Sequence, residues 1–228
     1  FHRAKEPMKS DSEQIPLCIP EIGEEEIGAV ADVLRSGWLA HGPKNTEFEE
    51  AFRGFIGTRH AISLNSCTSA LQLALQALGI KGEVIIPSFT FVATANAVVT
   101  AGATPVFADV DFATRNVSPD AVEAAITPCT EAIMPVHDGG LPADMDAIMA
   151  IAERHGLRVI EDSAECLGGT CRERMAGSYD IACFSFFPTK NMTTGEGGML
   201  TTNDDAVASR IRSLAAHGID STTYAREK

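Results

Sequence analysis

Short apolar runs of strand length alternate with segments of helical periodicity along most of this chain. The runs lie at His60–Asn65, Glu83–Phe89, Pro105–Val110, Ala132–His137, Leu157–Asp162, Ile181–Phe186 and Met199–Thr202. Helix-period segments lie between or after them, at Ser66–Leu78, Phe91–Thr100, Pro119–Ile126, Ala143–His155 and Asp204–His217. This alternation predicts a three-layer α/β/α sandwich, in which helices cover both faces of a mainly parallel sheet of about seven strands.

Two more helices are expected before the first strand, over Glu24–Arg35 and Asn45–Ile56. The loop between them holds Trp38, the only tryptophan of the chain. Residues 1–14 are expected to be a flexible N-terminal segment or tag remnant, residues 15–58 a helical segment, and residues 59–218 one large α/β domain. The connection between the last two predicted strands is mostly turn, so one of these strands is expected to be antiparallel.

The charge and cysteine content exclude several classes of protein. Acidic residues outnumber basic ones by 31 to 18, and the net charge of −13 argues against a surface that binds nucleic acid or an anionic membrane. The six cysteines form no C-x-x-C pair and show no spacing typical of a zinc site, so we expect no metal and reduced thiols in a cytoplasmic protein. No apolar stretch approaches the ~20 residues that span a bilayer.

Lys190 lies between an apolar strand-like run and a glycine-rich turn, and it is the only lysine between Lys81 and Lys228. One interpretation is a partly buried side chain that extends its amine to solvent. The other is a reactive amine, because desolvation and nearby cations lower the pKa of a lysine. A neutral amine of this kind acts as a nucleophile or holds a carbonyl cofactor as a Schiff base.

Ligands of open α/β sheets bind at the carboxyl ends of the strands, so the residues that follow each predicted strand are candidates for a site. They are Cys67, Thr68, Phe91, Asp162 and Ser185. A helix start offers backbone donors to a phosphate, an aromatic ring offers a flat face, and a carboxylate keeps a ring nitrogen protonated. Together with Lys190 these residue types suit pyridoxal phosphate.

Each of these residues also has a purely structural interpretation. Taken alone, Asp162 is as typical of a helix cap or an ion-pair partner as of a cofactor ligand. Ser66 and Thr68 are common capping residues at the start of a helix. An isolated phenylalanine such as Phe91 belongs more often to a core than to a cofactor site. Their common position at strand ends favours the cofactor interpretation.

Eight short blocks of the sequence resemble one known family. They begin at Ser36-Gly-Trp38 and continue with residues 66–71, 87–96, 102–106, 142–146, 159–162, 184–190 and 194–198. In this order and spacing, from about Ile15 to Gly218, the chain resembles the DegT/DnrJ/EryC1/StrS family of sugar aminotransferases. The resemblance implies the fold of aspartate aminotransferase, called fold type I, with residues 59–218 as the large domain that binds pyridoxal 5′-phosphate.

The resemblance also implies roles for matched positions. Lys190 is implied as the catalytic Schiff-base lysine, Asp162 as the partner of the pyridinium nitrogen and Phe91 as the stacking ring. Cys67, Thr68 and Ser185 are implied as the phosphate shell. Trp38 and Leu39 lie in the loop that lines the sugar side of the pocket in such enzymes.

Two positions depart from the pattern of many relatives. Cys67 replaces a glycine and adds a side chain close to the phosphate. Glu165 replaces glutamine or histidine near the 3′-oxygen of the cofactor, where a carboxylate repels a phenolate-like oxygen unless one of them is protonated. The version of the motif around Glu165 is similar to that of the perosamine-synthase branch, which aminates position 4 of a 4-keto-6-deoxy sugar.

The expected reaction moves an amino group from L-glutamate to a nucleotide-linked keto sugar, for cell-surface polysaccharide or glycosylated products. Family members are homodimers with the active site at the subunit interface, and they continue into a C-terminal small domain. We therefore expect residues 219–228 to begin a connection to such a domain. One alternative is a non-catalytic or regulatory remnant of the fold that still binds the cofactor. A sugar dehydratase of the same family is disfavoured, because those enzymes carry histidine in place of Lys190.

Overall fold

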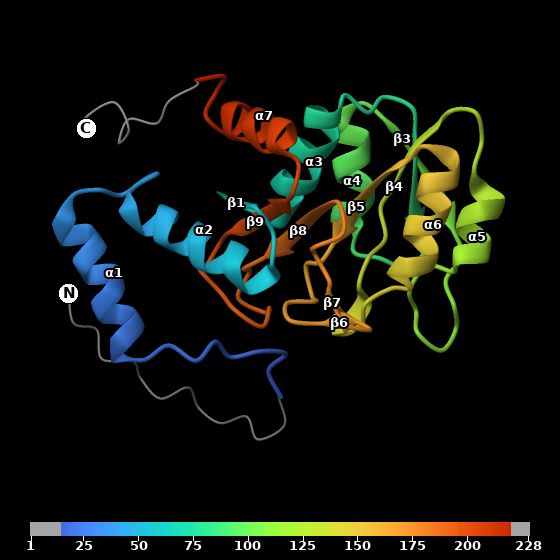
Figure 1. The fold of residues 1–228 in the computed structure, drawn as a ribbon. Coiled ribbons are helices and arrows are strands. Elements are labelled where there is room, and N and C mark those ends of the chain that lie inside the picture. Colours follow the sequence, from blue (N-terminus) through green and yellow to red (C-terminus); the bar gives the residue numbers. More distant parts are fainter. Residues whose placement is uncertain (1–14, 220–228) are drawn as a thin grey trace.

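The computed structural model describes residues 15–219, and its element order follows the predicted alternation of strands and helices (Figure 1). The helices are α1 (Glu24–Ser36), α2 (Pro43–Ile56), α3 (Cys67–Leu78), α4 (Val92–Ala101), α5 (Pro119–Ala125), α6 (Met145–His155) and α7 (Asp205–Ala215). The strands are β1 (His60–Leu64), β2 (Glu83–Pro87), β3 (Thr104–Ala108), β4 (Thr130–Ile133), β5 (Arg158–Asp162), β6 (Thr170–Cys171), β7 (Arg174–Met175), β8 (Ile181–Ser185) and β9 (Gly198–Thr202). A short 3₁₀ turn, η1, spans Asp138–Gly140.

Seven strands form one sheet in the order β1-β9-β8-β5-β4-β2-β3. The pairs from β8 through β5, β4 and β2 to β3 are parallel, whereas β9 pairs antiparallel with both β1 and β8. The expected antiparallel strand is therefore β9. Its register places Gly198 between Leu64 and Ser185, so three segments far apart in the sequence meet at one edge of the sheet.

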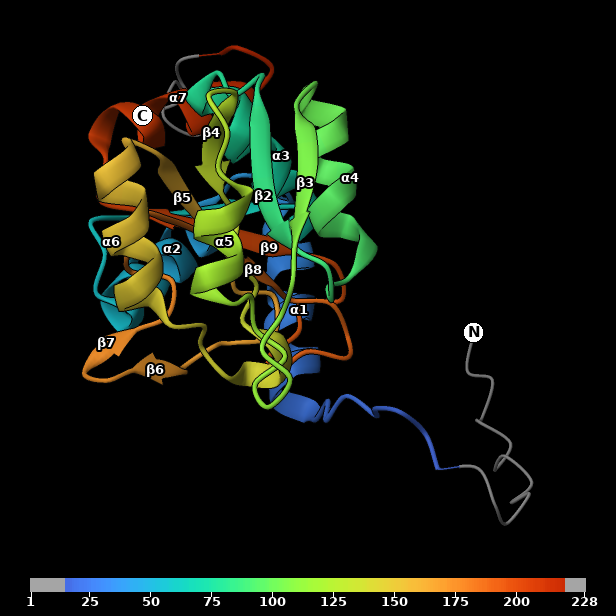
Figure 2. The same cartoon turned by 90° about the vertical axis from the view of Figure 1, so that its right-hand side faces the viewer.

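Helices cover both faces of this sheet, because each face carries its own apolar cluster. One cluster joins α3, α4 and α7 to the sheet through residues such as Leu71, Val98 and Ile211, all buried. The other face is covered by α5 and α6, with Val122 and Ile148 in its core, and by α2 near β1 and β8. Figure 2 shows α4 and α6 on opposite sides of the strands. The predicted α/β/α sandwich is confirmed.

Strand β4 ends at Ile133, four residues earlier than the apolar run predicts. Pro135 interrupts the ladder because proline has no backbone N–H to donate. The chain nevertheless stays beside β5: the carbonyl of Pro135 accepts from the amide of Asp162, and Val136 forms an isolated bridge with the same residue. The segment after β4 thus carries His137 to the end of β5, where its amide donates to the carbonyl of Asp162.

Some features lie outside the sequence-based expectations. The small antiparallel hairpin of β6 and β7 was not predicted, because strands of two residues leave no periodic pattern.

Residues 1–14 and almost all of 219–228 lie outside the described part of the chain, so the expectations for these segments stay predictions. The proposed domain boundaries stay predictions too. No helix within residues 15–219 has the length and apolar character needed to cross a bilayer.

Candidate active site

The carboxyl ends of β5 and β8 and the start of α3 meet at one edge of the sheet. Asp162 is the last residue of β5 and pairs in register with Cys183 of β8. Gly198 approaches the start of α3 so closely that a Cβ atom on it would lie 2.4 Å from the carbonyl carbon of Ser66 and 2.5 Å from the amide nitrogen of Cys67. Only glycine permits this contact, which holds the start of α3 against the sheet.

Asp162 is a buried carboxylate that accepts hydrogen bonds only from uncharged groups. Its Oδ2 accepts from the hydroxyl of Thr94 at 2.8 Å, and its Oδ1 accepts from the amide of Ala164 at 3.2 Å. No cation within residues 15–219 lies at salt-bridge distance from it. Burial raises the pKa of Asp162, and the bonds from Thr94 and Ala164 oppose the rise.

The side chain of Cys67 points toward this carboxylate. Its Sγ lies 3.9 Å from Oδ1 of Asp162 and is buried at the first turn of α3. Burial and the nearby Asp162 charge raise the pKa of the Cys67 thiol well above its usual range, so the group stays a neutral S–H donor. All six cysteines are described, and none of them forms a disulfide.

The first turn of α3 presents free backbone donors beside Asp162. Ser66 caps the helix, because its hydroxyl accepts from the amide of Ser69 at 3.1 Å. The amides of Cys67 and Thr68 have no acceptor within the described part of the chain, as expected for the first residues of a helix. Free N–H groups and the positive end of the helix dipole make this turn an anion site. Ser185, at the end of β8, is half-buried.

The amine of Lys190 lies 2.9 Å from Oε1 of Glu165. The other oxygen of Glu165 accepts from the amide of Gly139 in the η1 turn at 3.1 Å. Lys190 lowers the pKa of Glu165 through this hydrogen bond and its charge. Glu165, which the sequence marks as a departure, is therefore the residue that holds Lys190 in this structure.

Phe91 precedes α4 as its N-cap residue and leaves 78% of its surface exposed. Burial in a core would stabilise a phenylalanine side chain by ~1.5–3 kcal/mol, and a side chain as exposed as this one gains little of that free energy. The core interpretation of Phe91 is therefore wrong. The ring is free to cover a flat ligand.

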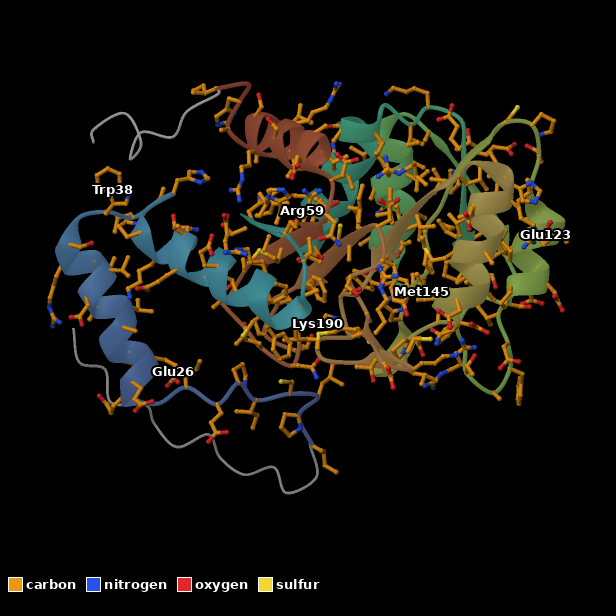
Figure 3. The ribbon with its side chains drawn as sticks, in the orientation of Figure 1. Glu26, Trp38, Arg59, Glu123, Met145 and Lys190 are labelled. Atoms are coloured by element: carbon orange, nitrogen blue, oxygen red, sulfur yellow. The ribbon has the colours of Figure 1, made fainter. Side chains whose placement is uncertain are left out.

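Trp38 and Leu39 are not brought to Lys190 within this chain. Figure 3 places Trp38 in the loop between α1 and α2, well away from Lys190. Leu39 is largely exposed and borders a cavity of about 550 Å³ that also contacts Asn45, Ser63 and Ser69. Neither Lys190 nor Asp162 lines this cavity.

The fold brings a buried histidine–glutamate pair next to Asp162, and the sequence patterns did not indicate this pair as part of the site. His137 and Glu161 are both fully buried, and Nε2 of His137 lies 3.1 Å from Oε2 of Glu161. Glu161 precedes Asp162 in β5, and two acidic residues at the end of an apolar run were the only signal that the sequence offered. The histidine lies 24 residues away, and only the fold brings it there.

Comparison with known proteins decides the family. The model of the DegT/DnrJ/EryC1/StrS aminotransferase family matches residues 20–228. The chain belongs to this family. It is 51% identical over 215 residues to the spore coat polysaccharide biosynthesis protein SpsC of Bacillus subtilis (strain 168), covering 93% of this chain and 55% of SpsC.

Several solved aminotransferase structures share the fold of this chain. The aminotransferase from Psychrobacter cryohalolentis superposes with a TM-score of 0.86 at 43% identity, over 87% of this chain and 52% of that one. DesI, solved in the presence of its TDP-sugar product, gives 0.86 at 42% identity, over 90% and 53%. The PLP form of the putative sugar aminotransferase Spr1654 from Streptococcus pneumoniae gives 0.84 at 34% identity, over 90% and 58%.

These findings confirm three predictions: the DegT/DnrJ/EryC1/StrS family, the fold type I class and pyridoxal phosphate as the cofactor of the family. The chain spans about half the length of the relatives it matches. The roles of individual site residues are not tested by the comparisons and stay predictions.

Replacing Glu165 with glutamine is expected to speed the reaction of Lys190 with added pyridoxal phosphate several-fold. The amine must leave Glu165 before it can react with an aldehyde, and a neutral amide holds an ammonium less strongly. Glutamine keeps an acceptor for Gly139, and a half-exposed pair is worth only about 0–1 kcal/mol, so the fold should be retained. The rate of growth of the visible absorbance band measures the effect, and a rate equal to that of the wild type would contradict it.

The same variant has a pH signature in stability. Because the folded pKa of Glu165 is lowered, the ion pair contributes stability above the unfolded value of about 4.3 and loses it as the pH falls through the folded pKa. The difference in melting temperature between wild type and Glu165→Gln should therefore be small at pH 7 and vanish in acid.

Proposed function

We propose that this chain forms the cofactor-binding part of an aminotransferase that moves an amino group from L-glutamate to a nucleotide-linked keto sugar, with pyridoxal 5′-phosphate as cofactor. The observation that carries the proposal is the buried Asp162 carboxylate, which lacks a cation within residues 15–219 at the sheet edge where α3 begins. A positive partner stabilises the charge of a buried carboxylate, and a pyridinium nitrogen would be such a partner.

The residues present fit this cofactor. Asp162 would hold the proton on the ring nitrogen, and Phe91 would cover the ring with its exposed face. The free amides of Cys67 and Thr68 would bind the phosphate, together with the hydroxyl of Ser185. When bound, pyridoxal phosphate supplies an aldehyde for the amino group and a ring that withdraws electrons from the neighbouring carbon.

The protein's own contribution is attachment, orientation and proton transfer. Lys190 would attach the cofactor through its Nζ atom and afterwards carry a proton to and from the reacting carbon. Glu165 would lie near the 3′-oxygen, since it already contacts Lys190. The Cys67 thiol donates toward Asp162 and, because it is neutral, would not replace the pyridinium nitrogen as the positive partner of that carboxylate.

The substrate is inferred from the family and its named relatives. SpsC acts in spore coat polysaccharide biosynthesis, and DesI was solved with a TDP-sugar product. We propose that the substrate is a nucleotide-linked 4-keto-6-deoxyhexose, because the motif around Glu165 is similar to that of the perosamine-synthase branch. The product would serve the synthesis of cell-surface polysaccharide or of a glycosylated compound. Cytoplasmic localisation stays a prediction.

We also propose a homodimer in which Trp38 and Leu39 line the sugar side of a site on the partner subunit. Helix α1 buries none of its residues in this chain, and Ile27, Val30 and Leu34 are each more than half exposed. These three residues are spaced by three and four positions, so they form one apolar stripe. An apolar stripe of this kind favours a protein contact.

Two measurements test the proposal. Adding pyridoxal phosphate should produce an absorbance band near ~400–430 nm, and its absence would overturn the proposal. The second measurement is turnover of L-glutamate with a panel of nucleotide-linked 3-keto and 4-keto sugars. Turnover on a 4-keto sugar supports the full proposal. A band without any turnover would instead support the alternative, a non-catalytic remnant that keeps the cofactor.

A further inference from the structure

The carboxyl group of Glu161 lies in the core, on the opposite face of β5 from the side chain of Asp162. It is fully buried, and three donors surround its carboxylate. Oε2 accepts from the amide of Gly177 at 2.7 Å and contacts Nε2 of His137, whereas Oε1 accepts from the amide of Tyr179 at 3.0 Å. Because these three hydrogen bonds share one carboxylate, they fix the positions of Gly177, Tyr179 and His137 relative to β5.

The hydrogen bonds of His137 fix which ring nitrogen carries its proton. Nδ1 accepts from the amide of Ala143 at 3.1 Å, so this nitrogen has no proton. The proton therefore lies on Nε2 and is donated to Glu161. The backbone amide of His137 also donates to the carbonyl of Asp162 at 3.1 Å. His137 thus bonds to both residues at the end of β5.

The segments joined by this pair are those that carry the candidate site. Gly177 and Tyr179 belong to the turn that leads into β8, the strand that ends at Ser185 before Lys190. His137 precedes the η1 turn, whose Gly139 donates to Glu165, the partner of Lys190. The pair connects the end of β4, the end of β5 and the turn before β8.

We propose that Glu161 and His137 are positioning residues for the cofactor site: they set the end of β5 for Asp162 and the η1 turn for Glu165. Neither side chain bonds to a candidate site residue: Glu161 and His137 contact each other and the backbone amides of Ala143, Gly177 and Tyr179. The inference rests on the proposed function, since it concerns the place where pyridoxal phosphate would bind. A purely stabilising role would leave the bound cofactor unchanged.

Two histidine variants separate positioning from stability. His137→Asn keeps an acceptor for Ala143 but is too short to donate to Glu161. His137→Gln places its amide donor farther out, near the position of Nε2, and should recover part of the lost contact. We expect His137→Asn to bind pyridoxal phosphate about tenfold more weakly, the lower end of what outer-layer partners contribute at metal sites. We expect His137→Gln to lie between it and the wild type.

Glu161→Gln tests the other half of the pair. A glutamine has one acceptor oxygen, so either Gly177 or Tyr179 faces an amide N–H₂ group and the turn shifts. The control is Glu131→Ala, which removes the acceptor of the Lys81 and Gly82 amides at the opposite edge of the sheet. It should lower the melting temperature without changing cofactor affinity.

The experiment measures the dissociation constant of pyridoxal phosphate and the pH midpoint of its visible band for the wild type and each variant. The wild-type band tests the proposed function separately. Weaker binding and a moved midpoint in His137→Asn, with partial recovery in His137→Gln, support positioning. If Glu161→Gln does not fold, the two histidine variants still decide. Wild-type affinity and midpoint in variants that only melt earlier would overturn the inference.

Discussion

Replacing Lys190 with alanine is expected to abolish amino transfer while the protein stays folded. The loss of proton transfer alone should lower kcat by about 10²–10⁴, and the loss of covalent attachment adds to it. The fold should tolerate the change, since Lys190 contacts Glu165 only at the partly exposed edge of the site. The measurements are kcat with L-glutamate and a keto sugar, the visible band of bound cofactor, and the melting temperature.

Lys44 provides a matched control for this experiment. Its amine also pairs with a single carboxylate, Glu47, but on the exposed surface of α2. Lys44→Ala removes the same number of atoms and the same charge, and it should leave both the band and kcat unchanged. A Lys190→Ala protein that keeps the band would show that another amine holds the cofactor. It would overturn the proposed role of Lys190.

The fold was predictable because the buried strands of a parallel sheet leave long apolar runs in the sequence. β5 and β8 are almost wholly buried, so polar residues appear only where each strand ends. That is why Asp162 and Ser185 could be singled out by position, whereas Lys190 was singled out as the only lysine between Lys81 and Lys228. β4 was predicted too long because the apolar run was extended through Pro135, whose lack of a backbone N–H interrupts the ladder.

The supporting contacts of the site could not be predicted in the same way. Glu161 and His137 meet only because β4 and β5 are neighbours in the sheet, and a single sequence does not give strand order. The ion pair of Glu165 with Lys190 likewise depends on two loops that converge in space. Local patterns thus locate candidate groups, and the tertiary structure decides which of them touch.

Asp162→Asn is expected to stabilise the cofactor-free protein at neutral pH and to disable the enzyme. Because burial raises the folded pKa of Asp162, this group favours the folded state below its unfolded value of about 3.9. The advantage is lost as the pH rises through the folded pKa. Asparagine removes the buried charge, and Thr94 can turn its hydroxyl to accept from the new amide, since Thr90 lies 2.7 Å away as its alternative partner.

The measurement is the melting temperature of both cofactor-free proteins across pH, where 1 kcal/mol corresponds to about 2–4 °C for a chain of this size. The variant should melt higher at pH 7, and the difference should shrink in acid as Asp162 becomes protonated. Asp180→Asn should show the opposite sign at pH 7, because both carboxylate oxygens of Asp180 accept from Arg158 and an asparagine offers only one acceptor. The other carboxylate near Arg158, that of Asp204, lies 3.9 Å away.

Activity should move against stability in Asp162→Asn. Without the carboxylate, the ring nitrogen of the cofactor loses the charge that keeps it protonated, and kcat should fall by about 10²–10³, as when a preorganised electrostatic partner is removed. A stable, inactive variant would show that Asp162 is kept for its charge despite the burial of that charge. A variant that melts lower than the wild type at pH 7 would mean that the Thr94 and Ala164 bonds outweigh the burial of the carboxylate, and unchanged kcat would remove Asp162 from the mechanism.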